Sequence, residues 1–231
     1  MSVSLEDVEQ ARTVLAGRIH RTPTFGSTAL GVSLKAELFQ KTGSFKVRGA
    51  LNRLAALKPE ERERGVVTWS AGNHAQAVAW AAAEEGVDCL VQMWEDVSPL
   101  KVEATRGYGA TVDLSPPDPA AAYDRVLEIV EEQGRVFVHP HSDPLVVAGH
   151  GTLALELLED VPDVETVVVG TGGGGLVSGI VTALRPRPRR RRRARARAGL
   201  PRGPRGRAQR ARRDRHDRRR ACAAVRRRTP A

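Results

Sequence analysis

Apolar residues recur along the first 185 residues in two patterns, stripes with the period of a helix and short continuous runs. The first stripe follows Ser4, a candidate N-cap, and predicts a helix over residues 5–16; its members are Leu5, Val8, Ala11, Val14 and Leu15. A second stripe predicts a helix over 46–57, which Pro59 should end because proline cannot continue a helix. A short strand is expected before it, at 34–38.

From residue 65 onwards, apolar runs and helical stripes alternate. The runs predict strands at 65–69, 87–93, 110–114, 136–138 and 164–169. The stripes predict helices at 75–85, 99–108, 120–133, 145–159 and 176–184. Short apolar strands separated by helices are typical of α/β proteins, so we expect parallel-rich sheets flanked by helices.

The pattern stops after Arg185, and the composition changes with it. Up to that residue, 16 Lys and Arg side chains stand against 25 acidic ones, a net charge of −9. Residues 186–231 hold 21 Arg and two Asp, a net charge of +19, which accounts for the overall +10. With so few large apolar side chains, this Arg-rich tail cannot bury a core, and we expect it to be disordered.

Two features of the chain bear on its compartment. Cys89 and Cys222 are too few for a disulfide framework. The first residues show no basic segment followed by an apolar one, so no signal peptide is expected, and no apolar stretch approaches the roughly 20 residues that span a bilayer. A cytoplasmic protein that does not contact a membrane is therefore expected.

One lysine lies in a segment suited to a flat cofactor, Lys46 in Gly43-Ser44-Phe45-Lys46-Val47-Arg48-Gly49-Ala50. Small residues beside it would let a planar ring lie close. An unprotonated amine can bond to an aldehyde, and burial favours this form by lowering the lysine pKa. Taken alone, the motif is also compatible with a solvated lysine at a helix start.

Four consecutive glycines, Gly172, Gly173, Gly174 and Gly175, separate a predicted strand from a predicted helix. Without side chains, several backbone N–H groups can approach a phosphate, and the helix N-terminus adds partial positive charge. The run lacks the Gly-Lys-Ser/Thr ending of a P-loop, so a Walker nucleotide site is not expected. A tight strand-to-helix turn is the structural alternative.

A third motif, Ser70-Ala71-Gly72-Asn73-His74, also lies between a predicted strand and a predicted helix. Its exposed amides could receive a substrate carboxylate while the Asn73 side chain reaches a cofactor. Capping of the helix by Ser70 or Asn73 is the alternative.

In their order along the chain, which is the lysine motif, then 70–74, then the glycine run, the three motifs resemble those of fold-type II pyridoxal phosphate enzymes, the tryptophan synthase β family. Within it, the chain is similar to threonine/serine dehydratases and serine racemases. The similarity runs from about residue 21 to about 186 and includes residues 101–110 and His139-Pro140. It also includes Ala148-Gly149-His150-Gly151-Thr152, where the family usually has Gln at the position of His150.

The resemblance implies a role for each motif, with pyridoxal 5′-phosphate as the cofactor. Lys46 would be the catalytic Schiff-base lysine, and Asn73 would hydrogen-bond the ring hydroxyl. Further cofactor contacts would come from Phe45, Gly172, Gly173, Gly174, Gly175 and Leu176. The substrate carboxylate would be held by Ser70, Ala71, Gly72, Asn73 and His74. No metal ligand is predicted.

The activity implied by the resemblance is that of a threonine/serine ammonia-lyase, which converts a β-hydroxy amino acid to a 2-keto acid and ammonia. Serine racemases of the family carry a second serine at the position of Ala71. Because Ala71 cannot act as an acid or base, dehydration is favoured over racemisation. A racemase-like enzyme or another fold-type II lyase is the alternative, and a family-type homo-oligomer is compatible with either.

The resemblance also implies two α/β domains with the cofactor between them, a large domain from 1–64 and 143–185 and a small domain from 65–142. Intact family members continue past the glycine loop, so the large domain is expected to be incomplete here and the activity weak. We expect residues 186–231 to result from a frameshift near Pro186, since Arg, Ala, Pro and Gly all use GC-rich codons. The non-enzyme alternative is an inactive fragment whose tail binds nucleic acid through charge alone, because the tail lacks aromatic residues for base stacking.

Overall fold

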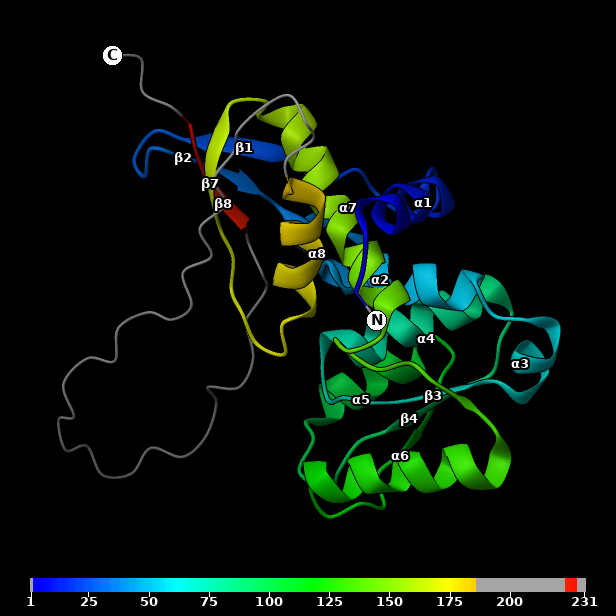
Figure 1. Cartoon of the computed structure of the whole chain (residues 1–231). Helices are drawn as coiled ribbons and strands as arrows, with labels where there is room; N and C mark the ends of the chain where they lie inside the picture. Colours follow the sequence, from blue (N-terminus) through cyan, green and yellow to red (C-terminus); the bar gives the residue numbers. More distant parts are fainter. Residues whose placement is uncertain (1, 186–222, 228–231) are drawn as a thin grey trace, which may run out of the picture.

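The structure is a computed structural model that describes residues 2–185 and 223–227. Its lower region in Figure 1 is built on a sheet with the strand order β5-β4-β3-β6, in which all pairs are parallel. The strands are Val66–Trp69 (β3), Cys89–Gln92 (β4), Thr111–Asp113 (β5) and Val136–Phe137 (β6). The connecting helices are Asn73–Glu85 (α4), Pro99–Arg106 (α5) and Pro119–Gln133 (α6). Each of these elements was predicted from the sequence, with ends that differ by at most two residues.

Helices cover both faces of this parallel sheet (Figure 1). On one face, Val66 joins the core formed with α4 and with α2 (Lys46–Ala55), whereas Val67 packs on the other face against Val126 and Ile129 of α6. Successive strand residues point to opposite faces, which is why these two valines enter different clusters. Burial on both faces explains the continuous apolar runs in the sequence.

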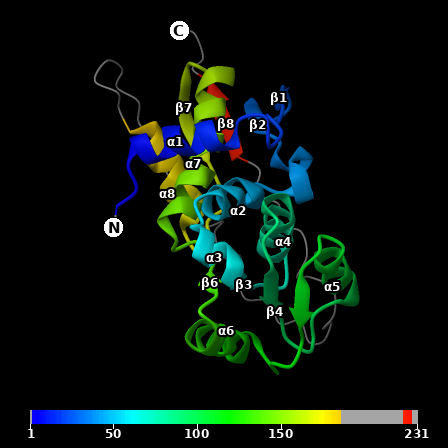
Figure 2. The ribbon, with the colours of Figure 1, turned by 90° about the vertical axis from the view of Figure 1, so that its right-hand side faces the viewer.

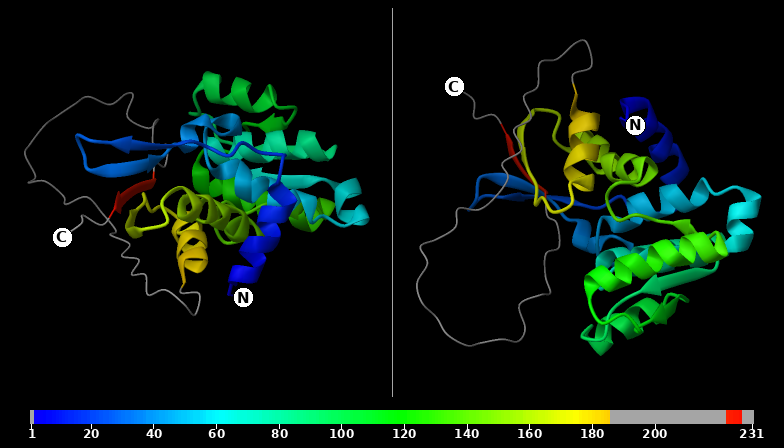
Figure 3. Two further views of the ribbon diagram at one scale, coloured as in Figure 1. Left: turned by 90° about the horizontal axis from the view of Figure 1, so that it is seen from above. Right: turned by 60° about the horizontal axis from the view of Figure 1, so that its bottom comes forward.

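The upper region in Figure 1 combines a second sheet with a layer of helices. The sheet has the strand order β1-β2-β8-β7, with strands Thr24–Ser27 (β1), Val32–Lys35 (β2), Ala223–Arg227 (β8) and Val164–Val168 (β7). The helices are Leu5–Leu15 (α1), α2, Pro59–Arg64 (α3), Pro144–Asp160 (α7) and Gly175–Leu184 (α8), with short 3-10 turns at Glu37–Phe39 (η1) and Lys41–Gly43 (η2). Figures 2 and 3 show α1 and α8 beside α7, and α1 also contacts α2.

Four expectations differ from the structure in this region. The strand predicted at 34–38 is observed as β2 at Val32–Lys35, and Glu37–Phe39 form η1. Every described pairing of the second sheet is antiparallel, so the parallel arrangement holds for one sheet only. Pro59 does not simply end a helix but begins α3, because proline at the first helical position gives up no hydrogen bond. Within the tail 186–231, predicted to be disordered, residues 223–227 form β8; the remainder of the tail lies outside the described residues.

Helix α2 packs across the domain boundary that the sequence analysis predicted between residues 64 and 65. Val47, Leu51 and Leu54 of α2 belong to the same apolar cluster as α4 and one face of the parallel sheet. The helix that carries Lys46 is therefore fixed against the region predicted to be the small domain. Within the described part of the chain, no helix is both long and apolar enough to cross a membrane.

Helix α7 is buried at nearly every position from Val146 to Leu157 and crosses two neighbouring helices at very short range. A Cβ atom on Gly149 would overlap the carbonyl oxygen of Arg48 in α2. At the crossing with α8, a Cβ on Gly179 would lie 2.5 Å from the carbonyl oxygen of Val147. Glycine is required at these positions because the backbones themselves are in contact.

Gly149→Ala is expected to destabilise the fold by about 3 kcal/mol, because the added methyl group meets backbone that moves only if α2 and α7 separate. Urea unfolding followed by circular dichroism measures the change. Gly26→Ala is the matched control, since a Cβ there meets nothing within 4 Å, and its effect should stay below about 0.5 kcal/mol. Equal stability of the two variants would contradict this crossing geometry.

A buried ion cluster ties α2 to α7 and η1. The Arg48 guanidinium, which is 0 % exposed, donates from Nε and Nη2 to the two carboxylate oxygens of Glu37, both at 2.8 Å. It also donates to Glu156 of α7, at 2.6 and 3.0 Å. The buried Lys35 ammonium completes the cluster, 2.8 Å from Glu156 and 3.0 Å from Asp160. The charges are thus compensated by partners from four elements.

Candidate functional site

Lys46 is the first residue of α2, and its amine is largely removed from water. Nζ donates a hydrogen bond to the carbonyl oxygen of Pro140 at 2.7 Å. Loss of hydration lowers the pKa of Lys46 to about 8. At pH 7, roughly a tenth of such amines are unprotonated, compared with fewer than about one in a thousand for an ordinary lysine. The amine is therefore available as a nucleophile or a base near neutral pH.

The segment 138–141, which follows β6, connects the three sequence motifs. The carbonyl oxygen of Val138 accepts a hydrogen bond from His74 Nε2 at 3.0 Å, and that of Pro140 accepts the bond from Lys46. His141, the last residue of the segment, lies against the glycine loop, where a Cβ on Gly173 would overlap its ring. The segment therefore lies next to Lys46, to the N-terminus of α4 and to the glycine loop.

This convergence follows from the parallel sheet. Strands β3 and β6 are adjacent and parallel, so their carboxyl ends meet at one edge, the usual position of ligand sites in α/β sheets. The motif 70–74 leaves the end of β3 and the segment 138–141 leaves the end of β6. The rings of Trp69 and His139 pack edge to face across this edge, with centroids 5.7 Å apart.

Ser70, Ala71, Gly72 and Asn73 are half-buried at the start of α4. The N-cap is Gly72, and no side chain of the described residues caps the helix, so the capping alternative for Ser70 and Asn73 is wrong. Ser70 Oγ instead accepts a hydrogen bond from the Gly72 N–H at 3.2 Å, and Ala71 packs against the core. The first N–H groups of an uncapped helix are free to bind an anion.

His74 is buried and neutral. Burial, reinforced by the nearby Lys46 charge, lowers the pKa of His74 to about 3. Its Nε2 is committed to Val138, and within the described part of the chain Nδ1 has no hydrogen-bond partner. A neutral imidazole cannot attract a carboxylate by charge, so any contact of His74 with a substrate carboxylate would have to come from its backbone N–H.

The glycine loop is open on one side and packed on the other. A Cβ on Gly172 or Gly174 would meet nothing within 4 Å, and Gly174 has a left-handed φ of 89° that favours glycine. Gly174 is the N-cap of α8, which, like α4, has no side-chain cap among the described residues. Leu176 is buried in the second core cluster together with Phe45. Leu176 could therefore offer a ligand only its backbone.

His150, at the position where the resembled family usually has Gln, is buried in α7. Its ring packs edge to face on that of Phe45, with centroids 4.9 Å apart. Burial, with a smaller contribution from the Lys46 charge, lowers the pKa of His150 well below its ordinary value. His150 is therefore a neutral packing residue behind the N-cap of α2.

The segment 138–141 was not among the predicted site residues, although His139-Pro140 was part of the resemblance. Its place in the site depends on β6 lying next to β3, and the order of strands in a sheet is not visible in the spacing of the motifs. Among residues 2–185 and 223–227, no three His, Cys, Asp or Glu side chains are grouped as metal ligands.

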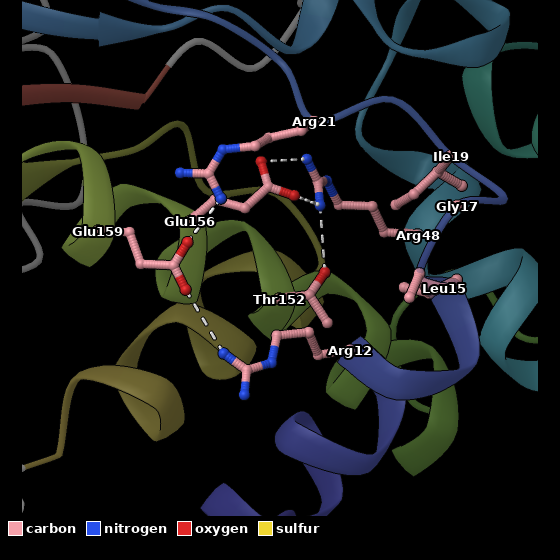
Figure 4. A pocket seen from close by; sticks show the side chains of 10 residues that line it. Arg12, Leu15, Gly17, Ile19, Arg21, Arg48, Thr152, Glu156 and Glu159 are labelled. Atoms are coloured by element: carbon pink, nitrogen blue, oxygen red, sulfur yellow. Dashed lines mark hydrogen bonds and ion pairs between the residues drawn. The ribbon is translucent and has the colours of Figure 1, made fainter.

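A separate hollow of about 150 Å³ lies between α1 and α7 (Figure 4). Its polar lining consists of side chains already paired with one another, as Arg12 and Arg21 are with Glu159 and Arg48 is with Glu156. None of the predicted site residues lines it. The hollow therefore belongs to the structural ion cluster and not to the site around Lys46.

Comparison with known proteins gives concordant matches. Residues 15–226 match the family model described as pyridoxal-phosphate dependent enzyme, a match that extends beyond the region of resemblance at 21–186. L-threonine ammonia-lyase of Thermotoga maritima is 48% identical over 189 residues, which cover 79% of this chain and 47% of the relative. L-threonine dehydratase catabolic TdcB of Escherichia coli is 43% identical over 191 residues, covering 80% and 58%.

Solved structures agree in fold. Serine racemase from Dictyostelium discoideum superposes with a TM-score of 0.79 at 36% identity, covering 87% of this chain and 67% of that one. The T.th. threonine deaminase gives a TM-score of 0.73 at 42% identity, covering 78% and 60%. The chain spans about half the length of the curated relatives it matches.

Proposed function

The chain belongs to the pyridoxal-phosphate dependent enzyme family, and from this premise we propose that it is a lyase that converts L-threonine or L-serine to a 2-keto acid and ammonia. The water lost with the β-hydroxyl is taken up again when ammonia is released. The observation that carries the proposal is the desolvated Lys46 amine, hydrogen-bonded to segment 138–141, which also contacts the glycine loop and the start of α4. Threonine dehydratases and ammonia-lyases at 43% and 48% identity support the reaction type.

The residues around Lys46 fit pyridoxal 5′-phosphate. The open side of residues 172–175 and the uncapped start of α8 can receive an anion. Lys46 would bond to the aldehyde, Phe45 would lie beside the bound ring, and Asn73, first residue of α4, would reach the ring hydroxyl. When bound, the cofactor supplies a conjugated ring that makes the α-proton of an attached amino acid removable.

Lys46 has two tasks in this proposal. It would hold the cofactor covalently, and its amine would take the α-proton from the bound substrate. Both tasks need the unprotonated amine. A pKa of about 8 supplies it near neutral pH, because a base works best when its pKa lies close to the working pH.

The start of α4 would hold the substrate. Backbone N–H groups of residues 70–74 can accept the carboxylate, with the partial positive charge of the helix N-terminus in support. Ala71 carries no proton to give or take, so Lys46 is the one base proposed for the α-carbon. This arrangement favours loss of the β-hydroxyl over inversion of the α-carbon. We also propose the division into 1–64 with 143–185 and 65–142, with the site at their junction.

The test is an assay of the purified chain with added cofactor. We expect a visible absorbance from the lysine–cofactor link and formation of 2-keto acid and ammonia from L-threonine and L-serine. Formation of D-serine without keto acid would favour the racemase alternative. Absorbance without either product would show that the chain binds the cofactor but is not a working lyase.

A further inference from the structure

His141 is a side chain for which the proposed reaction gives no role. Its half-buried ring lies directly against the glycine loop: a Cβ on Gly173 would overlap Cδ2 and Cγ of the ring and would lie 2.6 Å from Nε2. Its backbone is also close to the loop, because a Cβ on Gly175 would lie 2.9 Å from the His141 Cα. The side of the ring that carries Cγ, Cδ2 and Nε2 therefore faces Gly173 at close range.

The other ring nitrogen of His141 is already engaged. Nδ1 lies 3.0 Å from Ser142 Oγ, and a hydroxyl that donates to Nδ1 leaves the proton on Nε2. The ring is held from the side by His139, whose centroid is 4.6 Å away at an interplanar angle of 83°. With Ser142 as the donor to Nδ1, His141 presents Nε2 as a hydrogen-bond donor beside Gly173.

The titratable side chains that face His141 are a lysine and two histidines. Lys46 faces it from α2, His74 from α4 and His139 from its own segment, and the loop on its fourth side consists of glycines. The nearby carboxylate of Asp143 is taken up by Arg53 Nε at 2.9 Å and by the N-terminus of α7. Lys46 is thus the cation that acts on His141, while His74 is neutral, and a lysine beside an open glycine loop is a setting that an anion would complete.

We propose that His141 is a phosphate-binding residue whose Nε2 donates a hydrogen bond to the phosphate held by the amides of residues 172–175. The proposal rests on the proposed function, in that the phosphate is that of the cofactor. It adds a titratable side chain to a site that otherwise holds its anion through backbone alone.

The proposal predicts the direction in which phosphate binding changes with pH. In the free protein, burial first and the Lys46 charge second lower the pKa of His141. A phosphate at Nε2 favours the charged imidazolium and raises this pKa above its value in the free protein. Binding is therefore strengthened at a pH below the free-state pKa, and this advantage is lost as the pH rises through the bound-state pKa.

The experiment uses pyridoxine 5′-phosphate as the probe, because its alcohol cannot bond to Lys46, with pyridoxine as the phosphate-free control. Calorimetry of the full chain at about pH 6 and about pH 8.5 compares wild type with His141→Phe, which keeps the ring shape, and His141→Gln, which keeps a donor but cannot titrate. His20→Phe, at an exposed histidine outside the site, is the matched control. The phosphate itself titrates near pH 6, so the difference between variants is the readout.

We expect His141→Phe to weaken binding of pyridoxine 5′-phosphate about tenfold at pH 6 and less than about twofold at pH 8.5. His141→Gln should lose the extra pH dependence, and neither variant should change pyridoxine binding. Equal affinity of His141→Phe and wild type at pH 6 would overturn the proposal and leave the ring as a packing residue. If circular dichroism shows His141→Phe to be unfolded, His141→Gln decides: retention of the wild-type pH dependence would overturn it.

Failure of the proposed function would look different. A chain that forms no keto acid but shows the His141 effect on the phosphate probe would refute the lyase activity and keep the phosphate contact. A chain that turns over threonine but shows no effect of His141 on the phosphate probe would support the lyase activity and refute the phosphate contact.

Discussion

Replacing Lys46 with alanine is expected to abolish covalent attachment of the cofactor and to lower turnover of L-threonine by about 10⁴-fold or more. The side chain supplies both the amine that holds the cofactor and the base for the α-proton, so one substitution removes two functions. Its desolvated amine, with a pKa of about 8, has the protonation behaviour that both functions need. Absorbance titration with the cofactor and an ammonia assay measure the two losses.

Lys58→Ala provides the control for this experiment, because Lys58 is an exposed lysine at the N-cap of α3. It should leave both readouts unchanged. Borohydride reduction followed by peptide mapping locates the attachment directly. A reduced cofactor found on any lysine other than Lys46 would refute the assignment, whatever the activity of the variants.

Arg48→Met is expected to destabilise the fold by about 3–5 kcal/mol, the second large effect. The substitution keeps most of the side-chain volume but leaves the carboxylates of Glu37 and Glu156 buried without their main partner. Burial alone would raise the pKa of Glu156, but hydrogen bonds from Arg48 and Lys35 outweigh it and hold that pKa below its ordinary value. Urea unfolding at neutral pH measures the loss.

The matched control is Arg125→Met on α6, where the arginine pairs with Glu128 at the surface. Exposed pairs contribute little, and we expect a much smaller change than that of Arg48→Met. The depressed pKa of Glu156 stabilises the wild type above the ordinary pKa of a glutamate and ceases to do so as the pH falls through the lowered value. Arg48→Met should therefore lose less stability than wild type on acidification, and an identical acid response would argue against this account of the cluster.

The sequence predicted many helices and strands of both regions well because local physics determines them. Ser4 forms a capping box with Asp7 at the start of α1, as its position before an apolar stripe suggested. Strands such as β3 were recognisable because burial on both faces leaves a continuous apolar run. The order β5-β4-β3-β6 was not recognisable, because it is decided by which strands pair in three dimensions.

The site also has parts that local sequence signals indicate and parts that depend on strand pairing. The lysine and glycine motifs were found because their residue types are suited to one chemistry. His141 and Pro140 were not chosen, because their relevance arises only when β6 pairs with β3 and carries segment 138–141 to the other motifs. The antiparallel second sheet was missed for a related reason: strand direction depends on the path of the chain between strands.

The burial of α7 has a consequence for how the molecule opens. This helix touches α1, α2 and α8 and keeps almost no face in contact with solvent between Val146 and Leu157. If α7 separated from its neighbours, its apolar side chains would be exposed to water on all sides. Small local fluctuations therefore do not expose its backbone amides to exchange. Deuterium uptake in α7 should therefore be the slowest in the described chain and should report the free energy of global unfolding, while loops around the site exchange within seconds.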